Sequence, residues 1–361
     1  MNDMYRLVIS LVLLTMTCLG TAAVADQDMD PQLQSKAKRA TDNGLKYLRS
    51  QQAEDGSWSK SVGITALALR AFLESHRGYN ESDGAFITRP IAYVLAHVND
   101  DGSISEALAN RNYTTAVAIT ALQATGNPAY DEVIRNAQSF LRKLQLDEED
   151  GYSPEHRYYG GIGYGGDERP DLSNEYLALE ALATTSLDPE DPVWAKALTF
   201  VSRCQNRSES NDQAWAADDG GFTYMPGYSP HGGTGSYGGM THAGLLALLF
   251  AGIDKNDPRV QAAYGWIRSN YTLDDNPGAV GRQGLFYYYN AFAKSMYAFG
   301  EPTVTDDAGV VHNWRDDLAT TLLSMQAADG SWSNPYSQRW WEGVKDLVTA
   351  WSVIALNLAV R

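Results

Sequence analysis

The feature that most constrains this chain is a loop that occurs twice, almost unchanged, at opposite ends of the sequence. The first copy is Gln52-Ala53-Glu54-Asp55-Gly56-Ser57-Trp58, and the second is Gln326-Ala327-Ala328-Asp329-Gly330-Ser331-Trp332. A glycine after aspartate supplies the positive φ that ends a helix at low cost. Apolar-periodic segments lie on both sides of each copy. The loop therefore predicts a staple between the end of one helix and the beginning of the next.

Weaker versions of this loop divide the rest of the chain into six helix–loop–helix pairs. In the first pair, one helix face is formed by Ile64, Leu67, Ala68, Ala71 and Phe72. The Asp-Gly dipeptides of these loops begin at Asp55, Asp101, Asp150, Asp219 and Asp329. Six pairs of about 56 residues each then account for residues 26–361 as one repeat domain.

The pairs predict an all-α fold without a substantial β-sheet. The second helix of each pair is rich in alanine and leucine almost all round, so it is expected to be buried on all sides. This favours a closed (α/α)6 toroid, with the second helices as an inner ring and the first helices as an outer ring. An open solenoid is the alternative architecture.

The N-terminal residues 1–25 have the pattern of a secretory signal peptide. Arg6 precedes the apolar run from Leu7 to Leu14, and Ala23-Val24-Ala25 forms an A-x-A cleavage site. The sequence therefore predicts export, to the periplasm or the extracellular space. No other stretch is long and apolar enough to be a transmembrane span.

Cysteine content and charge restrict what the mature chain binds. Cys204 is the only cysteine after the signal, so no intrachain disulfide is expected. The net charge of −16 argues against nucleic acid and anionic membrane surfaces as partners. No sequence feature identifies a protein partner.

The spacing of glutamine, glycine and tryptophan in the loops resembles the repeat of squalene cyclases and of protein prenyltransferase β subunits. The resemblance covers all six pairs and is strongest at residues 52–58 and 326–332. It implies a terpenoid cyclase-like α/α toroid whose central cavity opens at the N-terminal ends of the inner helices. It implies no activity by itself, because one fold hosts several functions.

The cyclase motif Asp-x-Asp-Asp, found at the start of an inner helix, is incomplete in this sequence. Asp171 matches the first acid, but Ser173 and Asn174 replace the other two. Glu175 lies one helical turn after Asp171, so a displaced pair of acids, Asp171 and Glu175, is a candidate catalytic site. The sequence favours helix capping by Asp171 and Ser173 over this catalytic role.

The zinc ligands of the prenyltransferases are also missing, so neither a metal nor another cofactor is expected. The matching helix starts lack the Asp-x-Cys pair, and Thr349 stands at the histidine position. His242 is a further catalytic candidate near the start of an inner helix. Its simpler interpretation is a helix-start residue bonded to a loop.

Aromatic residues are frequent where the inner helices are expected to begin. The candidate ligand-binding residues at this level are Tyr113, Asn174, Tyr176, Tyr237, Tyr287, Tyr288, Trp340, Trp341, Glu342 and Asp346. Aromatic faces stabilise carbocations. Tyrosine and tryptophan also fill the narrow opening of a ring of helices, with their polar atoms toward water. The sequence leaves both roles open.

Together these features favour an exported protein that binds an apolar, isoprenoid-like or otherwise elongated ligand in a central cavity with an aromatic mouth. The sequence leaves open whether the protein is an enzyme; the resemblance implies a cyclase- or transferase-like reaction if it is. A carbohydrate-active enzyme is one alternative, because some polysaccharide lyases also use α/α toroids. A non-catalytic interaction scaffold is the other, although the Gly-Cys-Gly-Glu-Gln thioester string of some relatives is absent.

Overall fold

The computed structural model describes residues 29–107, 110–165, 169–185 and 187–361. The predicted signal peptide, residues 1–25, lies outside them. The first helices of the pairs are α2 (Pro31–Gln51), α4 (Ala85–Leu95), α6 (Asp131–Lys143), α8 (Pro192–Cys204), α10 (Pro258–Ser269) and α12 (Trp314–Met325). The second helices are α3 (Val62–Leu73), α5 (Arg111–Ala124), α7 (Leu172–Ala183), α9 (Gly238–Phe250), α11 (Leu285–Phe299) and α13 (Lys345–Ala359).

The predicted all-α fold class is confirmed for these residues. Short 3-10 helices lie in the connections, at η1 (Glu81–Asp83), η2 (Pro128–Tyr130), η3 (Glu148–Asp150) and η4 (Arg339–Trp341). Within the described ranges, β-strands are confined to an antiparallel ribbon of β1 (Thr303–Thr305) and β2 (Val311–Asn313), in which Val304 pairs with His312.

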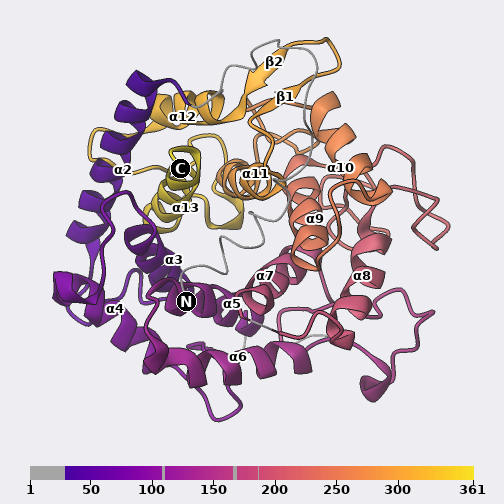
Figure 1. The fold of residues 1–361 in the computed structure, drawn as a ribbon, viewed down its shortest axis with the longest axis horizontal. Helices are drawn as coiled ribbons and strands as arrows, with labels where there is room; N and C mark the ends of the chain where they lie inside the picture. Colours follow the sequence, from indigo (N-terminus) through magenta and orange to yellow (C-terminus); the bar gives the residue numbers. More distant parts are fainter. Residues whose placement is uncertain (1–28, 108–109, 166–168, 186) are drawn as a thin grey trace, which may run out of the picture.

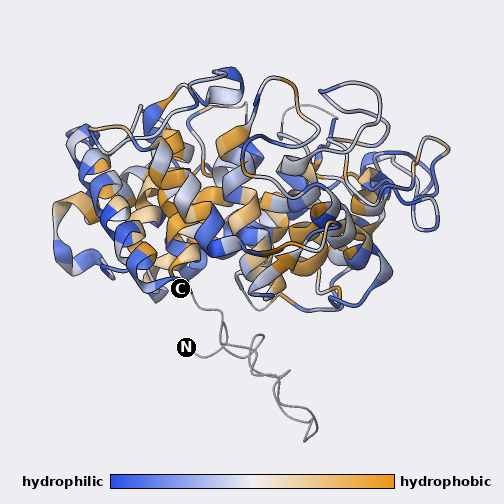
Figure 2. Cartoon of the chain, turned by 90° about the horizontal axis from the view of Figure 1, so that it is seen from above, coloured by the Kyte–Doolittle hydropathy of each residue, from blue (hydrophilic) through white to orange (hydrophobic). Residues whose placement is uncertain are grey.

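The second helices lie at the centre of the molecule and the first helices lie around them (Figure 1). Helix α13 is buried at every position from Leu347 to Ala359, whereas α6 buries one face that includes Ile134 and Leu141. Figure 2 shows hydrophobic residues concentrated along the helices and hydrophilic residues on the connections. In the ranges given above, no helix has both the length and the apolar composition that crossing a membrane requires.

Each central helix packs against the next one along the chain. Helix α3 contacts α5, α5 contacts α7, α7 contacts α9, α9 contacts α11, and α11 contacts α13. Helix α13 in turn contacts α3, and α2 contacts both α12 and α13. The order of contacts thus returns to the helices with which it began (Figure 1).

The loop at residues 52–58 joins its own pair to the following pair. Gln52 Nε2 donates a hydrogen bond to Gly56 O in the same loop, at 3.2 Å, and another to Phe86 O of α4, at 3.0 Å. The indole of Trp58 is fully buried, and its Nε1 donates to Leu48 O of α2 at 2.7 Å. The staple predicted from the sequence therefore also holds the next outer helix in place.

The loop at residues 326–332 makes the same contacts between the last pair and the first. Gln326 Nε2 donates to Gly330 O at 3.0 Å and to Ala40 O of α2 at 2.9 Å, and Trp332 is fully buried. Gly330 has a φ of 88°, and a Cβ added to it would lie 2.4 Å from Asn43 O. Only glycine fits this position, because both the backbone conformation and the close approach to α2 exclude a side chain.

The sequence predicts that Asp150-Gly151 is the Asp-Gly dipeptide of the third loop, equivalent to Asp55-Gly56 in the first, and this prediction is wrong. Gln145 Nε2 donates to Gly160 O and to Val193 O of α8, each at 3.0 Å, so Gly160 takes the place that Gly56 has in the first pair. Asp150 instead ends η3, inside the connection. Gly151 and Gly160 both have positive φ, of 84° and 82°, but only at Gly160 would an added Cβ also collide with a backbone carbonyl, that of Lys196 in α8.

Candidate functional site

A pocket lies beside the N-terminal end of α7, between the connection that precedes α7 and the connection from α8 to α9. It is open to solvent and has a volume of about 610 Å³. Its lining residues are Arg157, Tyr158, Tyr164, Arg169, Asp171, Tyr224, Met225, Gly227 and Tyr228. The pocket therefore combines an aromatic wall with a carboxyl group and two guanidinium groups.

Asp171 lines this pocket and also caps α7. Its Oδ1 accepts the backbone N–H of Asn174 at 3.0 Å, and its Oδ2 accepts from Asn174 Nδ2 at 2.8 Å. Burial raises the pKa of Asp171 to about 6, although hydrogen bonds from Asn174 and Tyr224 lower it. Of the two residues predicted to cap α7, Asp171 is therefore the one that does so, and the same side chain reaches the pocket.

Glu175 is turned toward the connection that precedes α7 and is not among the lining residues. Its Oε2 accepts the N–H of Ile162 at 2.7 Å. Burial, together with the charge of Asp171, raises the pKa of Glu175 well above its usual value. In four other pairs the corresponding loop N–H is accepted by a threonine of the second helix: Thr65, Thr115, Thr241 and Thr349. Glu175 thus stands in the place of a structural threonine.

His242 is buried between α9 and α11, outside the pocket lining. Its Nδ1 lies 2.6 Å from Ser295 Oγ, and its ring packs against Tyr288 and Phe292. Burial lowers the pKa of His242 to about 3, so the ring is neutral at physiological pH. The sequence predicts a hydrogen bond to a loop, but the partner is a serine within α11.

Four aromatic residues of the second helices, Tyr113, Tyr176, Tyr287 and Trp351, form an aromatic layer next to the pocket. The rings of Tyr176 and Tyr287 meet edge-on at 6.4 Å, and those of Tyr287 and Trp351 at 6.0 Å. Tyr113 interacts with Trp351 as well. The hydroxyl of Tyr287 donates to Ser173 Oγ at 2.9 Å, so a pair of hydroxyl groups occupies the position where cyclases carry their second acid.

The predicted residues of the last connection lie apart from the pocket lining. Trp340 and Trp341 are 38% and 69% exposed, and both have left-handed backbones, with φ of 56° and 68°. Glu342 is buried, which raises its pKa, and it accepts the N–H groups of Phe286 at 2.7 Å and Tyr287 at 2.9 Å. Glu342 therefore caps α11.

The remaining predicted residues have contacts within the helical framework. Asp346 accepts hydrogen bonds from Ser59 Oγ at 2.8 Å and from Tyr47 at 3.3 Å, which ties α13 to α2. Tyr288 is buried and donates to a backbone carbonyl, at 2.7 Å. Tyr237 is also buried, and its ring lies 4.6 Å from that of His231.

Most of the lining residues could not be predicted from helical periodicity, because they lie in irregular connections. Tyr164 and Tyr224 come from different connections, and their hydroxyl oxygens are 3.0 Å apart. Arg157 is fixed by the rings of Tyr158 and Trp215, at 4.9 and 5.0 Å, and by a hydrogen bond to a loop carbonyl. The connections from α6 to α7 and from α8 to α9 are the longest in the chain, and this length is the sequence signal that could have indicated a site there.

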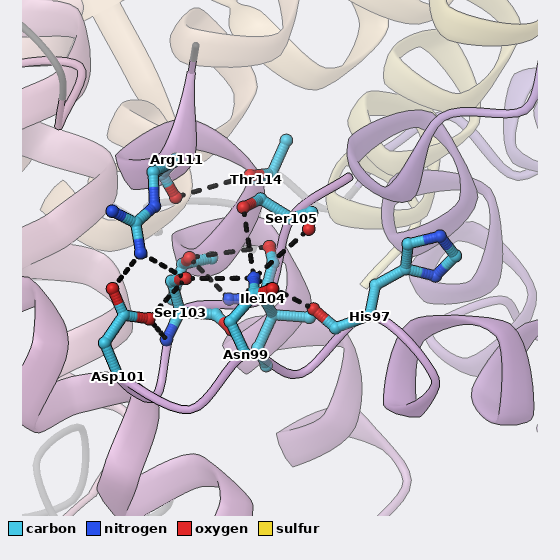
Figure 3. Close-up of polar contacts among 9 residues, drawn as sticks. His97, Asn99, Asp101, Ser103, Ile104, Ser105, Arg111 and Thr114 are labelled. Carbon is cyan, nitrogen blue, oxygen red and sulfur yellow. Dashed lines mark hydrogen bonds and ion pairs between the residues drawn. The ribbon is translucent and has the colours of Figure 1, made fainter. Parts of the chain in front are cut away.

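A second open pocket, of about 450 Å³, is lined by Arg111 and by residues between Asn99 and Ala107. Figure 3 shows that Arg111 contacts Asp101 and Ser103, and that Asn99 Nδ2 donates to Ser103 O at 3.3 Å and to Ser105 O at 3.2 Å. Burial raises the pKa of Asp101, but hydrogen bonds from Arg111 and Ser103 outweigh it and lower the pKa to about 2. These contacts hold the loop together. Within the described ranges, no group of three or more His, Cys, Asp or Glu side chains is placed to hold a metal ion.

Comparison with solved structures shows that this chain has a terpenoid cyclase-like fold. It is similar to ligand-free type II terpene cyclase MstE from Scytonema, with a TM-score of 0.53, 13% identity, and 90% of this chain and 98% of that chain covered. A substituted form of MstE in complex with geranylgeranyl dihydroxybenzoate gives a TM-score of 0.51 and 12% identity, covering 91% and 97%. A protein from Actinoplanes gives 0.54 and 16%, covering 90% and 99%. No protein-family model and no curated protein matches the chain.

Proposed function

We propose that this protein binds an isoprenoid-like ligand with a polar head group in the pocket at Asp171. The observation that carries the proposal is the composition of the pocket, in which four tyrosines surround one carboxyl and two guanidinium groups. Apolar pockets with a few convergent polar groups are typical of small-molecule sites. A solved structure of similar fold holds geranylgeranyl dihydroxybenzoate, which combines an isoprenoid chain with a polar aromatic head.

The guanidinium groups suit an acidic or phenolic head group. Arg157 and Arg169 both line the pocket, and arginine binds carboxylates through paired hydrogen bonds. Tyr164 and Tyr224 add hydroxyl groups beside Asp171. The head group therefore lies at the connections, and the apolar chain lies against the tyrosine rings.

The geometry supports binding in preference to protonation of an alkene. An acid that protonates an alkene has to be strong, yet burial raises the pKa of Asp171 to about 6 and so makes it a weaker acid than an ordinary aspartate. Ser173, at the second position of the cyclase motif, accepts a hydrogen bond from Tyr287 and carries no acidic proton. Glu175 faces Ile162 instead of the pocket.

We further propose that the helices form a closed toroid of six hairpins, as the sequence predicts. Support comes from the contacts of α13 with α3 and of α2 with α12, which join the two ends of the helical series. The hydrogen bond from Gln326 to Ala40 O makes the same connection at the loops. The carbohydrate-active alternative is not favoured, because the MstE structures of similar fold are those of a terpene cyclase.

Export remains a proposal that rests on the sequence of residues 1–25. Expression of the full chain in a bacterial host, followed by N-terminal sequencing of the protein outside the cytoplasm, tests it directly. The expected mature N-terminus is Asp26. Recovery of the protein only in the cytoplasm, with Met1 still present, would contradict export.

Binding of farnesyl dihydroxybenzoate, measured by isothermal titration calorimetry, tests the proposed function. Tyr228 lines the pocket and is 47% exposed, so Tyr228→Ala is expected to weaken binding about tenfold, because aromatic contacts add to the apolar area buried. Tyr336 is 57% exposed and does not line the pocket, so Tyr336→Ala is the matched control and is expected to bind as the wild type does. Failure of the wild type to bind, or equal weakening by both variants, would refute the proposal.

A further inference from the structure

Arg203, in the last turn of α8, is a buried arginine that bonds to both of the connections that line the pocket. Its side chain is 3% exposed. Its Nη1 donates to His156 O at 2.8 Å and its Nη2 to Pro154 O at 2.7 Å, both in the connection from α6 to α7. Its Nε donates to Asp212 Oδ1 at 2.8 Å, and Nη2 also donates to Oδ2 of this aspartate, in the connection from α8 to α9. One guanidinium group therefore joins the two connections.

The orientation of Arg157 depends on how these two connections lie relative to each other. Arg157 belongs to the connection from α6 to α7, but the groups around its guanidinium belong to the connection from α8 to α9. The ring centroid of Trp215 lies 5.0 Å from Arg157 Cζ, and Pro226 O accepts a hydrogen bond from Arg157 Nη2. A Cβ added to Gly227 would lie 3.2 Å from the same Nη2, so the backbone also approaches closely.

The contacts of Arg203 lie next to Arg157 in the first connection and close to Trp215 in the second. His156, whose carbonyl bonds to Arg203, directly precedes Arg157, and Asp212 precedes Trp215 by three residues. Arg203 itself is buried and does not line the pocket. Its influence on a ligand in the pocket is therefore exerted through Arg157.

We propose that Arg203 is a positioning residue for the acidic head group of the ligand, an inference that rests on the proposed function. The planar guanidinium carries five N–H donors, so it bonds to one carboxylate and two carbonyls at once. With both connections held in this way, Arg157 presents its guanidinium to the pocket in one orientation. Binding of a carboxylate then requires little further ordering of side chains, which favours affinity. Without Arg203, that ordering has to accompany binding.

Arg203→Met tests this role because it removes every donor and keeps a long side chain. The groups that lose their partner belong to exposed residues, Asp212 and His156 among them, so water replaces the lost bonds and the helices stay folded. The matched control is Arg142→Met, since Arg142 pairs with Asp191 between α6 and α8, at 2.7 Å, and does not line the pocket. Circular dichroism establishes that each variant is folded. If Arg203→Met is not, Arg203→Lys replaces it, because one ammonium cannot reproduce the fork of donors.

The measurement is the ratio of two dissociation constants, obtained by isothermal titration calorimetry for farnesyl dihydroxybenzoate and for farnesyl dihydroxybenzene, which lacks the carboxylate. The wild type and the control are expected to prefer the acid about tenfold, as a charge-assisted hydrogen bond gives. Arg157→Met is expected to reduce this preference to about threefold or less. Arg203→Met is expected to give the same value as Arg157→Met, and the double variant to give no further loss, because both substitutions remove one interaction.

Other results would overturn the inference. An unchanged preference in Arg203→Met, an equal loss of affinity for both compounds, or a further loss of preference in the double variant would show that Arg203 does not act through Arg157. Equal binding of the two compounds by the wild type would also overturn it. In each of these cases the wild type still binds the isoprenoid compounds, and the proposed function stands. No binding of either compound to the wild type would overturn the proposed function and this inference with it.

Discussion

Replacement of Asp171 by asparagine is expected to remove a pH dependence from the stability of the folded protein. The pKa of Asp171 rises from 3.8 to about 6 on folding, mainly through burial. Because the folded state holds its proton more tightly, stability contributed by this group is complete below pH 4 and is lost as the pH rises through about 6. A shift of about two pKa units, at about 1.4 kcal/mol each, amounts to about 3 kcal/mol at pH 7.

Asp171→Asn isolates this effect because asparagine caps a helix as well as aspartate does and cannot ionise. The variant is expected to match the wild type at pH 4 and to exceed its free energy of unfolding by up to about 3 kcal/mol at pH 7. Urea denaturation at both pH values, followed by circular dichroism, gives the two differences. Asp30→Asn is the control, since Asp30 caps α2 at an exposed position. A difference that is the same at both pH values, or that favours the wild type at pH 7, would refute the burial argument.

Three further substitutions test other parts of the account, each by urea denaturation. Gln326→Ala removes two hydrogen bonds, one of them to α2, so it is expected to cost about 1–3 kcal/mol, while Gln51→Ala at the exposed end of α2 has little effect. Lys294→Met alone takes a partner from buried Glu180 and is expected to cost about 3–5 kcal/mol; a cost below about 1 kcal/mol would contradict a buried pair. Glu175→Thr restores the threonine of the other pairs, and because burial raises the pKa of Glu175, it is expected to stabilise more at high than at low pH. A benefit that grows as the pH falls would show that Glu175 is stabilised by ionisation.

The helices were predictable because their signals are local and repeated. Residues 52–58 and 326–332 place a glutamine, a glycine and a tryptophan at fixed spacing, and the inner helices that follow are rich in alanine and leucine and buried almost all round. The same kind of signal misled at Asp150-Gly151, because an Asp-Gly dipeptide favours any turn with positive φ, whether or not the turn joins two pairs. The contact that defines the joint, from Gln145 to Gly160 O, spans an insertion that spacing alone does not reveal.

The candidate site was only partly predictable. Asp171 could be found because it matches one position of a motif at a helix start. Tyr164 and Tyr224 could not, because they meet through the folding of two irregular connections, which periodicity does not determine. Glu180 and Lys294 are charged residues in largely apolar helices, which indicates that each has a partner. That they pair with each other follows only from the three-dimensional structure.

A crystal structure of the protein with farnesyl dihydroxybenzoate tests the central claim most directly. The account predicts the head group beside Arg157 and Asp171, with the chain against the tyrosine rings that line the pocket. A pocket that remains empty at saturating ligand, or a ligand bound on another face of the molecule, would contradict it.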